Sequence, residues 1–428
     1  MKNWITDIFK QKGFIRSKLL LLLLMVVLEL YYHFLIVPEY AHLGFRSDFN
    51  GLNFLISKIA LLALFLLSWL FYNRSQFLYT IYLLLIFFFY IPNAILFAFG
   101  GGEFAPFLSN LFFVSSFLLS IYIPIRLPVF NRISGYSSWI LIGLSLLLLL
   151  PIIYTYRSSI NLNTLLLKDI YETRAVFSEK LSGMVNYFYH ISVKTILPIS
   201  LIFFMIRKKP VFIALYFFIL LYLFVISGNK FVYFTSIILV YFYYVGKDYA
   251  AKIQYFFLFT FLLFLIFPLL DYSFIKAEKP ILAGTFVNRF LFIPALLTQW
   301  YFDFFDGQPF YFAESHFFNQ FVKSPYDMPV GFLISKTYLN TTDTYANNGI
   351  VSDGFMNLGY WGVGLFSLIF SVLFAVFNSL KLHVGYYGLF FSYIYMILSA
   401  PLLSCFITGG ILLFIFLAIF ILREKDQL

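Results

Sequence analysis

The sequence has few charged residues for its length, and this scarcity excludes most soluble classes of protein. Of its 428 residues, 11% are charged and 62% are hydrophobic. A soluble domain carries roughly a quarter of its residues charged. The mean hydropathy is +0.90, and apolar runs of about 18 residues or more, long enough to cross roughly 30 Å of hydrocarbon, recur along the chain. These features indicate an all-α polytopic integral membrane protein.

Cysteine, histidine and nucleotide-binding motifs are also scarce. The single cysteine, Cys405, cannot form a disulfide within one chain, and five histidines are too few to build a metal cage. Carboxylate oxygens remain available to a hard cation. The sequence contains no glycine-rich phosphate loop or Walker pattern, and the expected cytoplasmic loops are too short for a nucleotide domain. We therefore expect no metal site and no cofactor.

The net charge of +10 does not indicate a nucleic-acid partner. Much of the basic excess lies at the ends of apolar runs, as at Arg74 and the run 207–209, where retention in the cytoplasm selects lysine and arginine. If the N-terminus is cytoplasmic, every inner loop is short and basic. Both termini are then cytoplasmic, and both long polar loops face the outside.

We expect a single membrane domain over 1–428 with about twelve transmembrane helices. A first outer loop covers 156–187, and a large outer loop, 271–352, precedes the last three helices. Within the large loop, the apolar stretch 281–301 contains Arg289 and Pro294, and it predicts a helix that lies in the outer interface or dips part-way into the membrane. The expected spans lie near 19–37, 53–72, 77–98, 105–124, 137–155, 188–206, 211–227, 231–246, 253–270, 353–378, 386–403 and 405–422.

Several cations stand outside the membrane, against the positive-inside bias. A lipid pyrophosphate would explain them, because its oxygens match the donors of arginine and lysine. The alternative is that they are ordinary solvated residues, balanced in the first loop by Asp169, Glu172 and Glu179. The candidate pyrophosphate-binding residues are Arg157, Arg174, Lys180, Lys230 and Arg289.

The large outer loop also gathers acids and aromatic rings. A carboxylate or imidazole near an apolar interface can act as the general base of a glycosyl transfer, and aromatic faces beside carboxylates can hold sugar rings. The alternatives are carboxylates that cap turns and aromatic residues that anchor the chain at the interface. The candidate catalytic residues are His316, Glu314, Asp343 and Asp303, and the candidate sugar-binding residues are Trp300, Tyr301, Asp306 and Tyr311.

Three charged residues fall inside or at the ends of expected spans, where charge is costly. Glu29 and Lys58 are placed to pair between the first two helices, which would make them structural. Lys194 lies near the outer end of its span and could face the outer site.

Two short motifs resemble those of the Wzy-type O-antigen and capsule polymerases. Asn357-Leu358-Gly359-Tyr360-Trp361-Gly362 resembles the family pattern Asn-Phe-Gly-x-x-Gly, with leucine in place of phenylalanine. Ser227-Gly228-Asn229-Lys230 resembles the Ser-Gly-x-Arg turn, with lysine in place of arginine. This replacement keeps the cation but loses the two-pronged guanidinium. The order of spans and long outer loops matches the family as well.

The resemblance implies a metal-independent glycosyltransferase with a GT-C-like fold in the bacterial inner membrane. It implies transfer of a growing glycan from undecaprenyl pyrophosphate onto the sugar end of an incoming lipid-linked repeat unit at the outer face. Arginines would bind the pyrophosphate, and an acid or histidine would activate the acceptor hydroxyl. The implied partners are the lipid-linked oligosaccharide, the bilayer, a repeat-unit flippase and a chain-length regulator, with no nucleic acid.

Three other functions stay open. An O-antigen ligase shares the architecture and the donor but uses a different acceptor. A transporter, including the lipid-linked oligosaccharide flippase, usually shows repeated halves and short outer loops, which this sequence lacks. A GT-C enzyme that uses a polyprenyl-monophosphate sugar would place its acids in the first outer segment, where Glu39 and Asp48 stand.

Overall fold

The computed structural model describes residues 2–127, 136–166, 168–181, 183–272, 280–315 and 318–423. In these ranges every named element is helical, and the one β-contact is an isolated bridge between Asp48 and Gly100. Eleven helices in the described part of the chain have the length and composition to cross a membrane. The expected all-α polytopic fold is confirmed at this level. The chain forms two compact units, which we describe separately.

Most of the expected spans coincide with a helix of membrane length. The exceptions are the spans expected near 231–246 and 386–403, which are the shorter apolar helices Lys230–Tyr244 and Val384–Ser399. One helix of membrane length, Ile281–Phe304, occupies the stretch for which we expected an interfacial helix.

Unit 1 comprises 1–124, 249–378 and 397–402. Its central helix runs from Gln76 to Phe99 and is buried on all sides, as expected of a helix that is apolar all round. The main helices of this unit are α1 (Lys2–Tyr31), α3 (Gly51–Arg74), α4 (Gln76–Leu85), α5 (Ile91–Phe99), α6 (Phe104–Ser116), α13 (Tyr249–Leu270), α15 (Ile293–Phe304), α16 (Val330–Leu339) and α17 (Ile350–Leu380).

Polar side chains fix where the first helices of unit 1 begin and how they pair. The Asn50 side chain accepts hydrogen bonds from the Leu52 and Asn53 amides and caps α3, and Ser75 caps α4 in the same way. Lys58 on α3 forms an ion pair with Glu29 on α1. The expected structural pairing of these two intramembrane charges is therefore confirmed.

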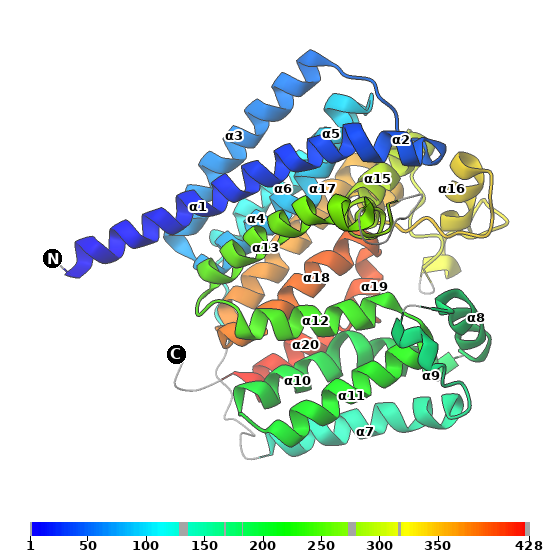
Figure 1. The fold of residues 1–428 in the computed structure, drawn as a ribbon. Coiled ribbons are helices and arrows are strands. Elements are labelled where there is room, and N and C mark those ends of the chain that lie inside the picture. Colours follow the sequence, from blue (N-terminus) through cyan, green and yellow to red (C-terminus); the bar gives the residue numbers. More distant parts are fainter. Residues whose placement is uncertain are drawn as a thin grey trace. The chain divides into compact units, whose positions relative to one another are not determined.

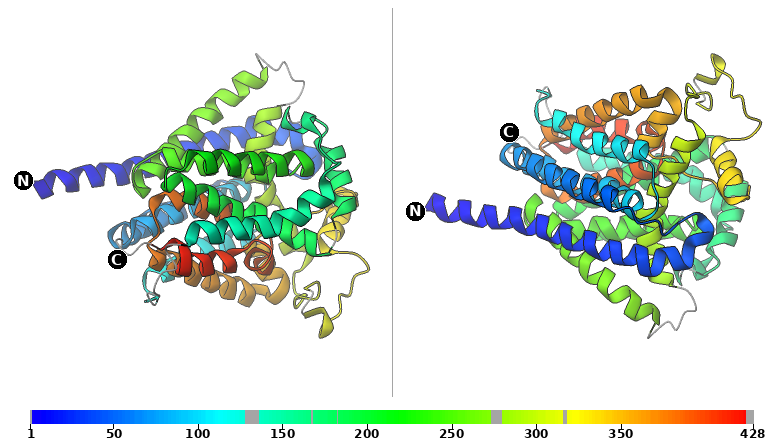
Figure 2. Two further views of the ribbon diagram at one scale, coloured as in Figure 1. Left: turned by 90° about the horizontal axis from the view of Figure 1, so that it is seen from below. Right: turned by 90° about the horizontal axis from the view of Figure 1, so that it is seen from above.

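The segment Ile281–Phe304 consists of α14 (Ile281–Ala283), the π-helix η8 (Gly284–Phe292) and α15. Asp271 is buried and accepts hydrogen bonds from the Leu282 and Ala283 amides, so its carboxylate holds the N-terminus of this segment. In Figure 1 the segment is seen nearly end-on, whereas α1, α3 and α13 lie across the view, and Figure 2 shows the same crossing from two other sides. Within unit 1 it therefore runs across the other helices.

Unit 2 comprises 125–248, 379–396 and 403–428. Its most buried helix runs from Gly183 to Ile206 and consists of α9 (Gly183–Ile191), the π-helix η6 (Ser192–Ile196) and α10 (Leu197–Ile206). Around it lie α7 (Ser137–Tyr156), α11 (Pro210–Ser227), α12 (Lys230–Tyr244) and α20 (Ile411–Leu417). The short helix α8 (Ile170–Lys180) lies in the first polar loop.

Candidate functional site

The segment that carries the Asn-Leu-Gly motif is a break in α17. Leu358 and Gly359 leave helical geometry, and Gly359 has φ 61° and ψ −147°, a conformation that favours glycine. The break frees the carbonyl groups of Met356 and Asn357, which accept hydrogen bonds from the Phe310 and Tyr311 amides at 2.8 and 3.1 Å. The glycine in the motif therefore lets the segment 310–312 dock onto α17.

Asn357 fixes the same loop with its side chain. The Phe312 amide donates to Asn357 Oδ1 at 2.7 Å, and Asn357 Nδ2 donates to Asp353 Oδ1 at 2.9 Å. Tyr311 and Phe312 have left-handed φ values of 50° and 60°, which are uncommon for residues with side chains. The hydrogen bonds to the end of the first half of α17 offset that cost. Asparagine suits this position because it donates and accepts at once.

Asp353 lies at the centre of this network, and sequence reasoning did not select it. Its side chain is buried, and it accepts hydrogen bonds from the Leu402 amide at 2.8 Å, from Asn357 Nδ2 and from Asn348 Nδ2 at 3.4 Å. Ser352 Oγ donates to Asn348 Oδ1 at 2.6 Å and completes the network. The signal that could have found Asp353 is a carboxylate one turn into an apolar helix.

The remaining glycines of the motif allow close backbone packing. A Cβ atom on Gly362 would overlap the carbonyl oxygen of Gly354, and one on Gly354 would lie 2.7 Å from the carbonyl oxygen of Gly362. By contrast, a Cβ atom on Gly364 would meet nothing within 4 Å. The two halves of α17 therefore touch backbone to backbone at Gly354 and Gly362.

Three carboxylates gather around the end of α15. Asp303, in the last turn of this helix, accepts a hydrogen bond from the Tyr338 hydroxyl at 2.6 Å. Partial burial and the nearby charges of Asp303 and Asp306 raise the pKa of Glu103, which precedes α6. Trp300 and Tyr338 stack with centroids 5.1 Å apart and an interplanar angle of 3°. We call Glu103, Asp303 and Asp306 the acidic cluster.

Glu103 joins this cluster although no sequence pattern selected it. It follows the turn Gly100–Gly102 between α5 and α6, about 200 residues before Asp303 in the sequence. Within unit 1, α15 packs against both of these helices, and this packing alone brings the two loops together. A carboxylate in such a place can act as a general base if a hydroxyl comes within hydrogen-bonding reach.

Glu314 lies apart from the cluster, at the opposite end of α16 from Tyr338. The Val330 amide donates to Glu314 Oε1, so the carboxylate caps the first turn of α16. Partial burial raises the pKa of Glu314, and the Val330 hydrogen bond opposes that rise. Partial burial also raises the pKa of Tyr345, with Glu314 the next contribution. This capping contact matches the structural alternative that the sequence left open.

The other outer-loop candidates fall in varied places. Asp343 is exposed in a turn in which its amide donates to Thr341 Oγ1. Trp300 and Tyr301 are buried, and the Tyr301 hydroxyl donates to the Ala346 carbonyl group at 2.8 Å, so both residues pack the unit. Tyr311 is 53% exposed and keeps a ring face available. His316 lies outside the described residues.

The structure brings together two cationic features that are far apart in the sequence. In unit 2, Arg174 Nη2 donates to the carbonyl group of Gly228 at 3.1 Å. Gly228 has φ 59°, and a Cβ atom there would lie 2.8 Å from the Ile170 carbonyl oxygen. Asn229 then caps α12, whose first residue is Lys230. The glycine turn therefore packs closely against α8, and Lys230 follows two residues after the carbonyl group that Arg174 contacts.

The remaining predicted cations have separate environments. Lys180 donates to Ser159 Oγ at 2.7 Å, and the Arg157 guanidinium lies 5.1 Å from the centroid of the Tyr154 ring. Both belong to the loop region of unit 2. Arg289 is exposed on η8 and belongs to unit 1. Among the described residues, no carboxylate forms an ion pair with Arg174 or Arg289.

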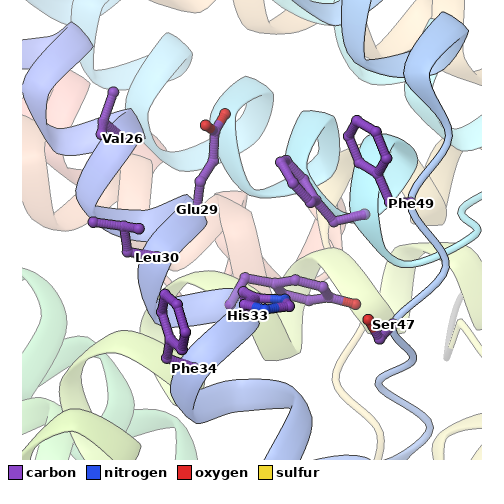
Figure 3. A pocket seen from close by; sticks show the side chains of 9 residues that line it. Val26, Glu29, Leu30, His33, Phe34, Ser47 and Phe49 are labelled. Carbon is purple, nitrogen blue, oxygen red and sulfur yellow. The ribbon is translucent and has the colours of Figure 1, made fainter.

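A groove of about 440 Å³ lies beside α1, away from all of the sequence-predicted site residues. Its lining includes Val26, Glu29, His33, Ser47 and Phe49, and Figure 3 shows Glu29 and His33 projecting from the same helix. Phe34 and Phe49 are 71% and 60% exposed at its mouth. The walls are mainly apolar with a few polar groups, as in many small-molecule pockets.

Comparison of the chain with protein-family models, with curated proteins and with solved structures gave no match. In the part of the chain that the structure describes, no group of three or more histidine, cysteine or acidic side chains has the geometry to hold a metal ion.

Proposed function

We propose that the protein polymerises undecaprenyl-pyrophosphate-linked oligosaccharide repeat units into O-antigen or capsular polysaccharide at the outer face of the bacterial inner membrane. The observation that carries this proposal is the contact between Arg174 and the Gly228 turn, with Lys230 one residue beyond Asn229. Two cations next to a tight turn suit a pyrophosphate, whose oxygens accept several charge-assisted hydrogen bonds. Arg174 has four further N–H groups to offer.

The acidic cluster supports the second half of the reaction. In the proposed step, an acceptor hydroxyl of the incoming repeat unit loses its proton to Asp303 as its oxygen attacks the anomeric carbon of the donor. A new C–O bond forms at that carbon, and its bond to the pyrophosphate oxygen breaks. Undecaprenyl pyrophosphate leaves with the electron pair, and a cation that binds its oxygens would stabilise the charge that develops.

Asp303 is favoured as the base over the other acids by its surroundings. The Tyr338 hydroxyl holds its carboxylate in one orientation, and Glu103 and Asp306 add negative charge nearby. These charges raise the pKa of Glu103, which stands next to Asp303 in the acidic cluster. Glu314 is already engaged by the N-terminus of α16. The donor chemistry supplies its own activation through the pyrophosphate leaving group, so no nucleotide site is required.

A gene deletion tests the proposal. The gene is deleted in its host, and surface polysaccharide is separated on a gel, with a plasmid-borne copy as the control. We expect loss of the long-chain ladder, with a single repeat unit still attached to core or lipid. Loss of all surface glycan would contradict a polymerase and favour a ligase or a flippase. An unchanged ladder would overturn the proposal.

A further inference from the structure

A polar stripe runs along the most buried helix of unit 2. It consists of Asn186, His190 and Lys194, spaced four residues apart in α9 and η6 and therefore on one side of the helix. The helix begins at the end of the unit that carries Arg174, because Phe177 of α8 packs against Tyr189 while Arg174 of the same helix contacts Gly228. The stripe thus leads from the cationic turn into the membrane span.

In the part of the chain that the structure describes, no carboxylate forms an ion pair with Lys194. None of the apolar helices of unit 2 that lie in its described ranges contains aspartate or glutamate. The titratable side chain one turn before Lys194 is His190, which is also a base. A charged lysine within a membrane helix is costly, and such residues usually pair with an opposite charge. An anion from outside the unit would supply that pairing.

The two neighbours of Lys194 also have unused hydrogen-bonding groups. In the described part of the chain, Nδ1 of His190 and Oδ1 of Asn186 are buried without a hydrogen-bond partner. Buried polar atoms in folded proteins are nearly always bonded. The amide of Asn186 can present either its oxygen or its nitrogen, because the two ends are assigned by their partners. Donors and a cation on one helix face suit an oxyanion.

We propose that Asn186, His190 and Lys194 bind a phosphate oxygen of the pyrophosphate that links the substrate to its lipid carrier. This inference rests on the proposed function and adds three binding residues to it. The ligand is lipid-borne because the stripe lies within a span. The Cα–Cβ bond of a helical residue is tilted toward the N-terminus of its helix, and for Lys194 this is the end of the unit that carries Arg174.

Binding of undecaprenyl pyrophosphate to the purified full-length protein in phosphatidylcholine nanodiscs tests the inference. Lys194→Met keeps the length of the side chain and removes its charge. We expect this variant to bind at least ~10-fold more weakly than the wild type, whereas Lys194→Arg binds within about threefold. Lys208→Met, in an exposed inner loop, is the matched control and is expected to bind as the wild type does. His190→Leu removes a donor at a second position and is also expected to weaken binding. This variant still tests the inference if Lys194→Met does not fold.

Each other outcome has a definite meaning. Equal binding by the wild type, Lys194→Met and His190→Leu would show that the stripe does not bind the pyrophosphate and would leave the proposed function in place. No binding by the wild type would overturn the proposed function itself. Displacement of the lipid by inorganic pyrophosphate at equal concentration would show a site for the free anion and contradict a lipid-borne ligand. Loss of binding in nanodiscs that contain phosphatidylglycerol would show a general site for anionic lipids and contradict the inference as well.

Discussion

Leucine is similar in size to asparagine but forms no hydrogen bonds. Replacing Asn357 by leucine therefore removes the side-chain hydrogen bonds that join the segment 310–312 to α17. The Phe312 amide loses its acceptor at 2.7 Å, and Asp353 Oδ1 loses a donor at 2.9 Å. A buried polar group left without a partner costs about 1–3 kcal/mol. We therefore expect the free energy of local loop opening to fall by about 2 kcal/mol in the variant. This change raises the equilibrium constant for opening roughly 30-fold.

Hydrogen–deuterium exchange measured by mass spectrometry on the peptide 308–315, in lipid nanodiscs, reads this opening directly. The Phe312 amide should exchange roughly 30-fold faster in the variant. The Phe310 and Tyr311 amides, which are bonded to backbone carbonyl groups at the same end of α17, should accelerate with it, because one opening releases all three.

Asn347→Leu is the matched control, since Asn347 is exposed and ten residues earlier in the same motif region. Its exchange pattern should equal that of the wild type. If the peptide 308–315 kept its protection in Asn357→Leu, the loop would not depend on the asparagine, and the account of the motif as a docking device would be wrong.

Three further predictions follow from the same geometry. Gly362→Ala should lower the free energy of unfolding by about 1–3 kcal/mol through overpacking. Gly364→Ala should not, because a Cβ atom added there meets nothing within 4 Å. Thermal unfolding in detergent compares the two variants. Glu103→Gln should raise thermal stability at neutral pH. The folded-state pKa of Glu103 is raised from its ordinary value of 4.5, so ionisation of Glu103 disfavours folding. The gain in stability should therefore shrink as the pH falls toward 4.5, and a gain that persists in acid would contradict repulsion as its cause. Arg174→Ala and, separately, Asp303→Asn should abolish long-chain polymer on a gel while the protein stays in the membrane at wild-type abundance; full polymer in either variant would remove that residue from the mechanism.

The positions of the helices could be predicted well because length and apolar composition decide which segments enter a membrane. The prediction was less successful where a glycine turn ends a run early. Gly246, with φ 77°, follows α12 soon after its end at Tyr244, and this helix is shorter than a typical span. The segment Ile281–Phe304 shows the opposite case. Its length fits a span, whereas its direction across α1 and α13 depends on packing that no hydropathy pattern contains.

The candidate sites show the same division between local and long-range information. Arg174 and Lys230 were both selected from the sequence, because the expected topology places each in a segment outside the membrane. The contact of Arg174, on α8, with the turn before Lys230 was not predictable, because it depends on the close packing of Gly228 against Ile170. Glu103 was missed for the related reason that a single acid after a short glycine turn has no local pattern, and only the packing of α15 against α5 and α6 gives it acidic neighbours.

Asp353 was missed for a different reason, because it lies outside the long polar stretch of the sequence. A search for polar stretches finds acids that water surrounds, as in 271–352, and such acids tend to lie at a surface. Asp353 follows that stretch, one turn into an apolar helix, where water does not solvate it and the Leu402 amide and two asparagine side chains do. A carboxylate in such a position persists only if the protein supplies its donors. The asparagines of the motif therefore supply these donors as well as holding the outer loop, and a motif of this kind predicts a buried acid within hydrogen-bonding reach of its asparagines.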